Sequence, residues 1–283
     1  MGLESFVGLL QRANREGWGI PLFDIFEREG TDGIFAAAEA KRAPTIVGTG
    51  GHIFDRPGGP EFMGYLVARA RSATVPITVY LDHGDSFERC IQALRLGFTD
   101  VMFDGSRLPI DENIAITKKV VQAAHAVGAG VEAEIGHVGQ GSQYESFGSQ
   151  REGFTKPDDA ERFVAETGVD ILAVAIGTAH GPYRGEPKLD YELLAEIHRR
   201  LPEIPLVMHG GSGLSDEQFR TAIRTGISKV NIFTDLAQSA TAAVQEVAAR
   251  EHANIMAMSN AFRDAFQSRS EHYLDVFGTS GRA

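Results

Sequence analysis

Three histidines of the chain share one sequence context. His83, His180 and His209 each come just after a short apolar run, and each is followed at once by glycine. If the apolar runs are strands of a parallel barrel, their carboxyl ends meet at one rim, where the three imidazoles can converge. A convergent imidazole trio suits a divalent metal with an open coordination position. The pattern therefore predicts metal-assisted chemistry on a small molecule.

Carboxylates end some of the same runs. Asp82 directly precedes His83, and in an extended strand adjacent side chains diverge, so His83 can bind metal while Asp82 faces substrate. We favour general acid or base catalysis by Asp82 over the alternative, a carboxylate that orients a histidine. Glu132 and Glu134 are two residues apart and share a strand face, where they can bind metal or form an ion pair with Lys or Arg. Asp104 ends the fourth run and adds a further carboxylate to this rim.

Two segments near the end of the predicted barrel indicate an anion site. The segment 209–214 (HGGSGL) follows the seventh run, and the segment 231–235 (NIFTD) ends the eighth and enters a helix. Backbone N–H groups of a glycine-rich loop and of a helix N-terminus can hold a phosphate without a basic side chain. This position is where such barrels commonly bind phosphate. A local phosphate site is compatible with the acidic charge of the chain.

The elements that would position these residues alternate regularly. Segments with helical spacing separate the apolar runs, for example 87–94, 114–127 and 216–225, the last with Ser215 as its N-cap. Eightfold alternation predicts an α/β fold, a single-domain (β/α)8 TIM barrel, rather than an open doubly wound sheet, which usually has fewer strands. The eight runs are Gly19–Ile25, Pro44–Gly48, Pro76–Asp82, Asp100–Asp104, Gly130–Ile135, Asp170–Ile176, Ile204–Met208 and Ser228–Phe233.

Composition limits the classes of function. The 283 residues, 43% of them hydrophobic, can bury a full core, and the net charge of −11 argues against a nucleic-acid partner. Cys90 is the single cysteine, so no internal disulfide or cysteine metal cluster is possible, and we expect a cytoplasmic protein. No signal peptide is recognisable, and no apolar stretch is long enough to predict a membrane span.

Two segments depart from the alternation. Gly136–Asp158 is polar and rich in Gly and Ser, and we expect it to be a mobile loop on the catalytic face. The tail after Glu251 is predicted to begin as a helix and to end flexibly, so residues 1–283 form one barrel domain with a C-terminal helical extension. His52 and His137 are expected in loops at the rim.

Six sequence blocks carry a family resemblance. The blocks LDHG, VMFDGS, VEAEIG, AVAIGTAHGPY, LVMHGGSGL and KVNIFTDL resemble, in this order, those of class II fructose- and tagatose-bisphosphate aldolases. The resemblance runs from about Pro21 to the C-terminus and is densest between Val79 and Asp235. It implies a zinc-dependent lyase that reversibly cleaves a ketose 1-phosphate or bisphosphate to dihydroxyacetone phosphate and an aldehyde.

The resemblance also implies roles for individual residues. Zn²⁺, or Co²⁺, Mn²⁺ or Fe²⁺ in its place, would be held by the three histidines, and Asp104 and Glu134 would lie near an alternate metal position. Asp82 would exchange a proton with the hydroxyl at the aldehyde carbon. A monovalent cation, Na⁺ or K⁺, would lie nearby, and the protein would be a homodimer or homotetramer. The residues implied to position the donor and its phosphate are Gly181, Gly211, Ser212, Asn231 and Thr234.

Three positions depart from the family pattern. Asp24 stands where the family has Asn, at the substrate end remote from the donor, and its carboxylate would repel a second phosphate. This favours an unphosphorylated or cationic aldehyde. Ser142 stands where a loop glutamate removes the donor's proton, and Glu145 is our candidate replacement, with Glu152 or His137 as alternatives. Phe233, where bisphosphate-specific relatives often carry Asp, is the third.

Two other functions compete with the aldolase interpretation. A metal-dependent sugar-phosphate epimerase or isomerase would use the same metal site and release no aldehyde. A non-catalytic sugar-phosphate-binding relative would explain the missing loop glutamate. Retention of Asp82 beside the predicted metal ligands argues against the second alternative.

Overall fold

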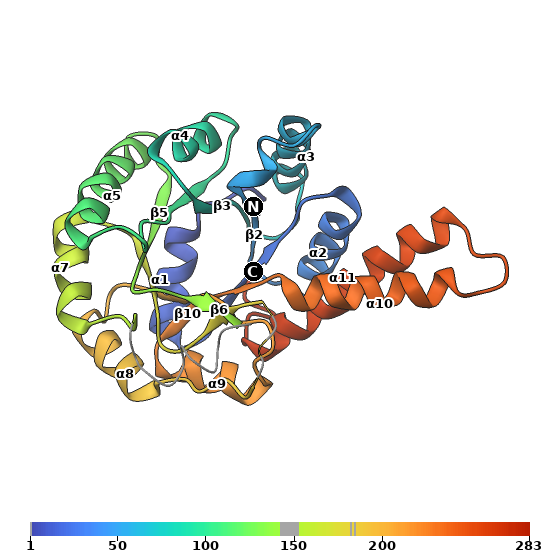
Figure 1. Cartoon of the computed structure of the whole chain (residues 1–283). Helices are drawn as coiled ribbons and strands as arrows, with labels where there is room; N and C mark the ends of the chain where they lie inside the picture. The colour runs from blue at the N-terminus through green and yellow to red at the C-terminus, as the bar shows by residue number, and fades with distance from the viewer. Residues whose placement is uncertain (1, 142–152, 182, 184) are drawn as a thin grey trace.

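The computed structural model describes residues 2–141, 153–181, 183 and 185–283. Eight parallel strands close into a barrel in the order β1-β10-β9-β7-β5-β4-β3-β2, and helices surround it (Figure 1). The predicted (β/α)8 barrel is therefore confirmed. Its strands are β1 (Ile20–Asp24), β2 (Thr45–Gly50), β3 (Ile77–Gly84), β4 (Asp100–Phe103), β5 (Gly130–Ile135), β7 (Ile171–Val174), β9 (Leu206–Met208) and β10 (Ile227–Ile232).

Burial on both faces explains why the strands were recognisable. Within β3, β5 and β10 nearly every residue is buried, so these strands are almost continuous rows of residues that exclude water. Each of the eight predicted runs overlaps one barrel strand. The exceptions to apolar composition, such as Glu132 and Lys229, are fully buried charged residues.

The N-terminal end of the barrel is closed by α1 (Phe6–Glu16). Phe6 and Leu10 are fully buried and belong to the same apolar cluster as barrel-interior residues of several strands. Asp100, the first residue of β4, accepts hydrogen bonds from the Ser5 hydroxyl, the Phe6 N–H and the Gly130 N–H. This end is therefore plugged, and chemistry is confined to the opposite rim.

The outer helices follow the strands in turn. The predicted segments 87–94 and 216–225 are helical, and Ser215 caps the second in a capping box, while the predicted 114–127 helix begins four residues earlier. Besides α1, the helices of the described chain are α2 (Arg28–Lys41), η1 (Gly51–Ile53), α3 (Gly59–Arg71), α4 (Phe87–Arg95), α5 (Ile110–His125), α7 (Pro157–Thr167), α8 (Tyr191–Arg200), α9 (Asp216–Thr225), α10 (Thr234–Ala248) and α11 (Ile255–Val276). The described helices include none that is long and apolar enough to cross a membrane.

The C-terminal part of the chain differs from the expectation of a flexible end. Helices α10 and α11 form a hairpin that projects from the barrel, and α11 packs against α2 (Figure 1). After it, Thr279 is fully buried and its hydroxyl donates to the Gly19 carbonyl, 2.6 Å away. The N–H groups of Gly281 and Ala283 donate to the carbonyls of Lys41 and Arg42. These contacts attach the C-terminus to α2, so the prediction of a flexible end was wrong.

Candidate metal centre and active site

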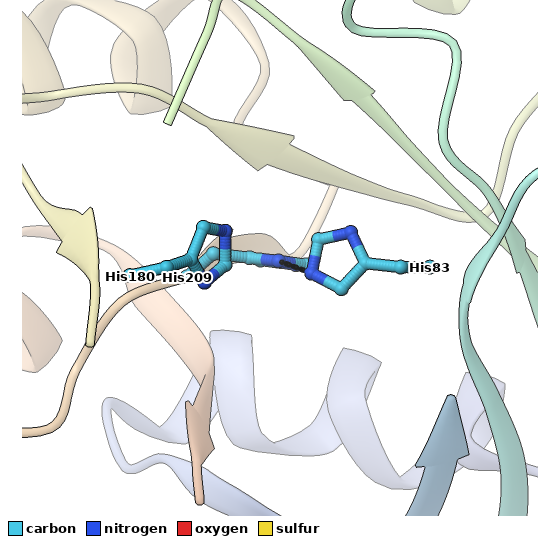
Figure 2. Close-up of side chains that lie close together, drawn as sticks. All are labelled: His83, His180 and His209. Carbon is cyan, nitrogen blue, oxygen red and sulfur yellow. Dashed lines mark hydrogen bonds between the residues drawn. The ribbon is translucent and has the colours of Figure 1, made fainter. Parts of the chain in front are cut away.

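The three predicted histidines meet at the carboxyl ends of the strands. His83 lies in β3, His209 follows β9, and His180 lies in the short strand β8 (Ala179–His180). Their side chains point toward one another (Figure 2), and one nitrogen of each lies within 4.8 Å of those of the others. His83 Nε2 and His209 Nδ1 are 2.9 Å apart. Three residues up to 126 positions apart thus form one cluster.

The backbone at His83 explains how two adjacent side chains reach the same cavity. Its φ of 44° lies in the left-handed region, which is uncommon for a residue other than glycine. The pairing of β3 with β4 also shifts register between Leu81 and Gly84. His83 Nε2 therefore lies 3.8 Å from Asp82 Oδ2, and both residues line one cavity. The prediction that the two side chains diverge was wrong because it assumed an extended backbone.

A small second sheet positions His180. Strand β6 (Gly139–Gln140) pairs with β8 in parallel, as a two-stranded sheet separate from the barrel. The Tyr183 hydroxyl accepts a hydrogen bond from the Ala179 N–H and donates to the Gly210 carbonyl, at 2.9 and 2.7 Å. This hydroxyl ties the segment that carries His180 to the turn after His209.

Gly210 is the position where a side chain would disturb this arrangement most directly. Its φ is 69°, and a Cβ atom there would lie 2.4 Å from the Ala179 carbonyl oxygen. We predict that Gly210→Ala lowers the free energy of unfolding by about 1–3 kcal/mol and weakens metal binding, because His209 must shift with its neighbour. Urea unfolding and metal titration measure the two effects.

Gly64→Ala is the matched control for that substitution. Gly64 lies inside α3 and an added Cβ would meet nothing within 4 Å, so alanine should stabilise the protein or leave it unchanged. Equal effects of the two substitutions would contradict the prediction.

Hydrogen bonds to carboxylates fix which nitrogens face the centre. His83 Nδ1 lies 2.8 Å from Asp104 Oδ2, and His209 Nε2 lies 2.8 Å from Glu132 Oε1, so each of these nitrogens donates to a carboxylate. The remaining nitrogens, His83 Nε2 and His209 Nδ1, then present lone pairs to each other. Two lone pairs this close require a shared cation, either a proton or a metal ion. The donor set therefore fits a divalent metal.

The charges around the centre favour a cation too. Burial alone would lower the pKa of His83, but the carboxylates of Asp82, Asp104 and Glu134 outweigh it and raise the pKa to about 10. Burial and the neighbouring His209 and His83 lower the pKa of His180 to about 3, so its imidazole is neutral and able to bind a metal.

Asp104 and Glu134 form a second possible ligand group with His83. Glu134 is buried, and its Oε2 has no hydrogen-bond partner among the described residues. Burial raises the pKa of Glu134 to about 7, because the surrounding groups do not fully stabilise the charge of its carboxylate. A cation nearby would stabilise its charged form, in agreement with the proposed alternate metal position.

Glu132 plays a different part from Glu134. It is fully buried, and its Oε2 forms an ion pair with Lys229 Nζ at 2.8 Å while its Oε1 accepts from His209. Of the two alternatives for this carboxylate, the ion pair with a lysine is the one that the structure contains. Glu132 orients the His209 imidazole and does not belong to either group of possible ligands.

A cavity of about 400 Å³ opens beside the histidines. Asp82 lies in its wall, and Asp82 Oδ1 accepts a hydrogen bond from Asn231 Nδ2 at 2.8 Å. Thr234 begins α10, so the N-terminus of this helix faces the cavity, and the Ser212 hydroxyl accepts from the Asp235 N–H. All the residues predicted to position donor and phosphate line this cavity, namely Gly181, Gly211, Ser212, Asn231 and Thr234.

Asp24 lines both this cavity and a second hollow of about 700 Å³. Burial and the neighbouring Asp82 raise the pKa of Asp24 well above its usual range, and its Oδ1 has no hydrogen-bond partner among the described residues.

Phe233 lines both hollows and packs edge-on against Phe26. His52 lines the second hollow and His137 the first.

The comparisons with known proteins agree with this geometry. The family model described as fructose-bisphosphate aldolase class-II matches residues 4–282. The chain is 40% identical to a fructose-bisphosphate aldolase of Geobacillus stearothermophilus, with 100% of this chain and 99% of the relative aligned. It is 38% identical to a 6-phospho-5-dehydro-2-deoxy-D-gluconate aldolase of Bacillus licheniformis, with 100% and 97% aligned. The chain belongs to the class II fructose-bisphosphate aldolase family.

A solved structure supports the same assignment. The crystal structure of the YdjI aldolase from Escherichia coli K12 superposes with a TM-score of 0.87 at 33% identity, and the match covers 99% of each chain. The family is one of aldolases, which are lyases, so the resemblance noted in the sequence is confirmed.

Sequence analysis of this aldolase missed two residues of the site. Lys229 carries a charge inside the buried strand β10, two residues before Asn231 and on the same face, and that pattern could have indicated it. Arg107 lines three of the hollows at the rim, but its place in a loop gave no signal. Our candidate base Glu145, its alternative Glu152 and Ser142, which stands in place of the family's glutamate, lie outside the described residues, whereas the other alternative, His137, lines the first hollow.

Proposed function

We propose that this protein is a metal-dependent aldolase that reversibly cleaves a ketose 1-phosphate or ketose bisphosphate to dihydroxyacetone phosphate and an aldehyde. The observation that carries the proposal is the convergence of His83, His180 and His209, because two of them, His83 and His180, line one cavity with Asp82 and a helix N-terminus. A mere sugar-phosphate binder would not need a carboxyl beside a metal site. An epimerase would release no aldehyde, so an aldehyde-trapping assay distinguishes it.

The three histidines would hold the metal, and Asp104 and Glu134 would hold it in an alternate position. We propose Zn²⁺, with Co²⁺, Mn²⁺ or Fe²⁺ as alternatives, and Na⁺ or K⁺ near the donor. When bound, the divalent ion supplies Lewis-acid stabilisation of the negative charge that cleavage leaves on the donor fragment. The chain's own residues supply binding and proton transfer.

Asp82 is the proposed general base for cleavage and general acid for condensation. Its Oδ1 is held by Asn231, while Oδ2 faces His83 and the cavity. Asp82 would take the proton from the hydroxyl at the aldehyde carbon as the carbon–carbon bond breaks. The N–H groups near Ser212 and Thr234 would hold the donor phosphate. Glu145 stays our candidate for the residue that protonates the donor carbon.

Asp24 is the proposed determinant of aldehyde preference. A phosphate dianion beside this carboxyl must either keep it protonated or be repelled by its charge. We predict that the enzyme cleaves a ketose 1-phosphate with a higher kcat/KM than fructose or tagatose 1,6-bisphosphate. Asp24→Asn should raise kcat/KM for a bisphosphate by about tenfold or more.

A coupled assay for dihydroxyacetone phosphate, run over a panel of ketose 1-phosphates and bisphosphates, measures this preference. Faster cleavage of either bisphosphate than of any monophosphate would contradict the altered preference, although not the aldolase activity itself.

We also propose a homodimer or homotetramer. The projecting hairpin of α10 and α11 supports this, because Ile255 and Met256, where α11 begins, expose 76% and 68% of their surface. Cytoplasmic location stays a prediction from the cysteine content.

A further inference from the structure

We propose that Lys229 is a positioning residue that serves both halves of the active site at once. Through Glu132 it fixes the metal ligand His209. Through Asn231 it fixes the catalytic carboxyl of Asp82. The inference rests on the proposed function, because it assigns Lys229 a role toward the same metal site and the same proton transfer.

The surroundings of Lys229 are unusual for a lysine. Its side chain is 0% exposed, and burying an ammonium group is costly unless it is paired and hydrogen-bonded. Its Nζ lies 2.8 Å from Glu132 Oε2 and donates to Asn231 Oδ1 at 2.7 Å. The same nitrogen lies 4.7 Å from the centre of the Tyr80 ring, within range of a cation–π contact. The ammonium is therefore held from three sides.

The first link leads to the metal centre. One oxygen of the Glu132 carboxylate, Oε2, lies 2.8 Å from the Lys229 ammonium, and the other, Oε1, lies 2.8 Å from His209 Nε2. A carboxylate paired with an ammonium only accepts hydrogen bonds. His209 must then place its N–H at Nε2 and its lone pair at Nδ1, toward the other two histidines.

The second link leads to Asp82. A carbonyl oxygen accepts from an ammonium, whereas an NH₂ group cannot, so Lys229 fixes which way round the Asn231 amide lies. Its Nδ2 must then point to Asp82, where it donates to Oδ1. This leaves Oδ2 of Asp82 directed at the cavity. Without Lys229 the amide could turn over, and Asp82 would lose its donor.

Strand β10 explains why one lysine can reach both halves. Lys229 and Asn231 are two residues apart, so their side chains point to the same face of this strand, which is the barrel interior. Glu132 comes from β5, three strands away from β10 in the barrel order, and His209 follows β9. The ammonium and its partner Glu132 therefore connect β10, β5 and the end of β9.

The first test is the substitution Lys229→Met, which keeps the length of the side chain and removes its charge. We expect Co²⁺ to bind about 10- to 100-fold more weakly, measured by competition with a chelator, and the visible spectrum of bound Co²⁺ to change. Lys41→Met is the matched control, because it also removes an ion pair, of 2.7 Å with Asp275, far from the site. Its Co²⁺ affinity should equal that of the wild type.

The double variant Glu132→Gln with Lys229→Met is the control for misfolding of the single variant. It removes both buried charges together, so that no unpaired charge stays buried. An amide oxygen at position 132 can still accept from His209, so most of the lost Co²⁺ affinity should return. Asp82 would still lack its oriented partner. At saturating metal we therefore expect the double variant to exchange the donor proton of dihydroxyacetone phosphate nearly as the wild type does, and to condense it with an aldehyde about tenfold or more slowly.

The outcomes separate this inference from the proposed function. A folded Lys229→Met variant with wild-type Co²⁺ affinity and spectrum would overturn the link to the metal. Equal loss of donor exchange and condensation in the double variant would overturn the link to Asp82. In both cases wild-type protein that binds Co²⁺ and exchanges the proton leaves the proposed function standing. Wild-type protein that binds no Co²⁺ would contradict the metal site itself, and the inference with it.

Discussion

His180→Ala is expected to abolish turnover, with a loss of about 10³-fold or more, and to weaken metal binding by at least about 100-fold. Of the three proposed ligands, His180 is the one whose removal disturbs its surroundings least. Its ring donates no hydrogen bond to the described residues, and its low pKa leaves a neutral imidazole at neutral pH. Removing His209 instead would leave the buried Glu132 without one of its partners and confuse metal loss with unfolding. Metal titration and turnover on the same protein sample measure the two effects.

His252→Ala is the control for this substitution. The side chain of His252 is 93% exposed. The residue lies between α10 and α11, on the projecting hairpin, so its loss should change neither metal affinity nor turnover. Full metal affinity in the His180→Ala variant would contradict the assignment of His180 as a ligand. Added Zn²⁺ at high concentration should restore part of the activity if the loss arises from metal affinity.

Asp82→Asn is expected to lower the rates of cleavage and condensation by about 10²- to 10⁴-fold and to leave donor proton exchange nearly unchanged. The amide oxygen can still accept from Asn231 Nδ2, so the geometry is retained while the titratable proton is lost. The proposed role of Asp82 is confined to the aldehyde hydroxyl. Separate assays of exchange and condensation therefore measure the two halves of the reaction.

Asp264→Asn serves as the matched control, because Asp264 is 61% exposed on α11 and pairs only with the neighbouring Arg263 among the described residues. If Asp82→Asn slowed exchange as much as condensation, Asp82 would be a general determinant of the metal site and not the acid and base of the aldehyde step.

The barrel could be predicted because its strands are buried on both faces. Runs such as Gly130–Ile135 exclude almost all solvent, so apolar composition and glycine or proline at the ends mark them clearly. The histidines could be predicted for a related reason. Parallel strands must place their carboxyl ends at one rim, so His83 and His209 had to be near each other.

What could not be predicted depends on contacts between distant segments. The left-handed backbone at His83 is local strain that no periodicity indicates. Strand β8 is only two residues long and exists because it pairs with β6, so the sequence placed His180 after a strand and not in one. The partner of Glu132 was left open between a metal and a Lys or Arg side chain, because only the closed barrel brings Lys229 within 2.8 Å. The C-terminus was misjudged because its stability comes from α2.

The most direct test of the account is exchange of the carbon-bound proton of dihydroxyacetone phosphate, followed by NMR in D₂O. It needs no knowledge of the aldehyde. The account predicts exchange that a chelator abolishes and Zn²⁺ restores, as expected when the histidine cluster holds the metal beside the donor site. No exchange by metal-loaded protein would contradict the aldolase assignment and favour an epimerase with another donor or a sugar-phosphate-binding protein.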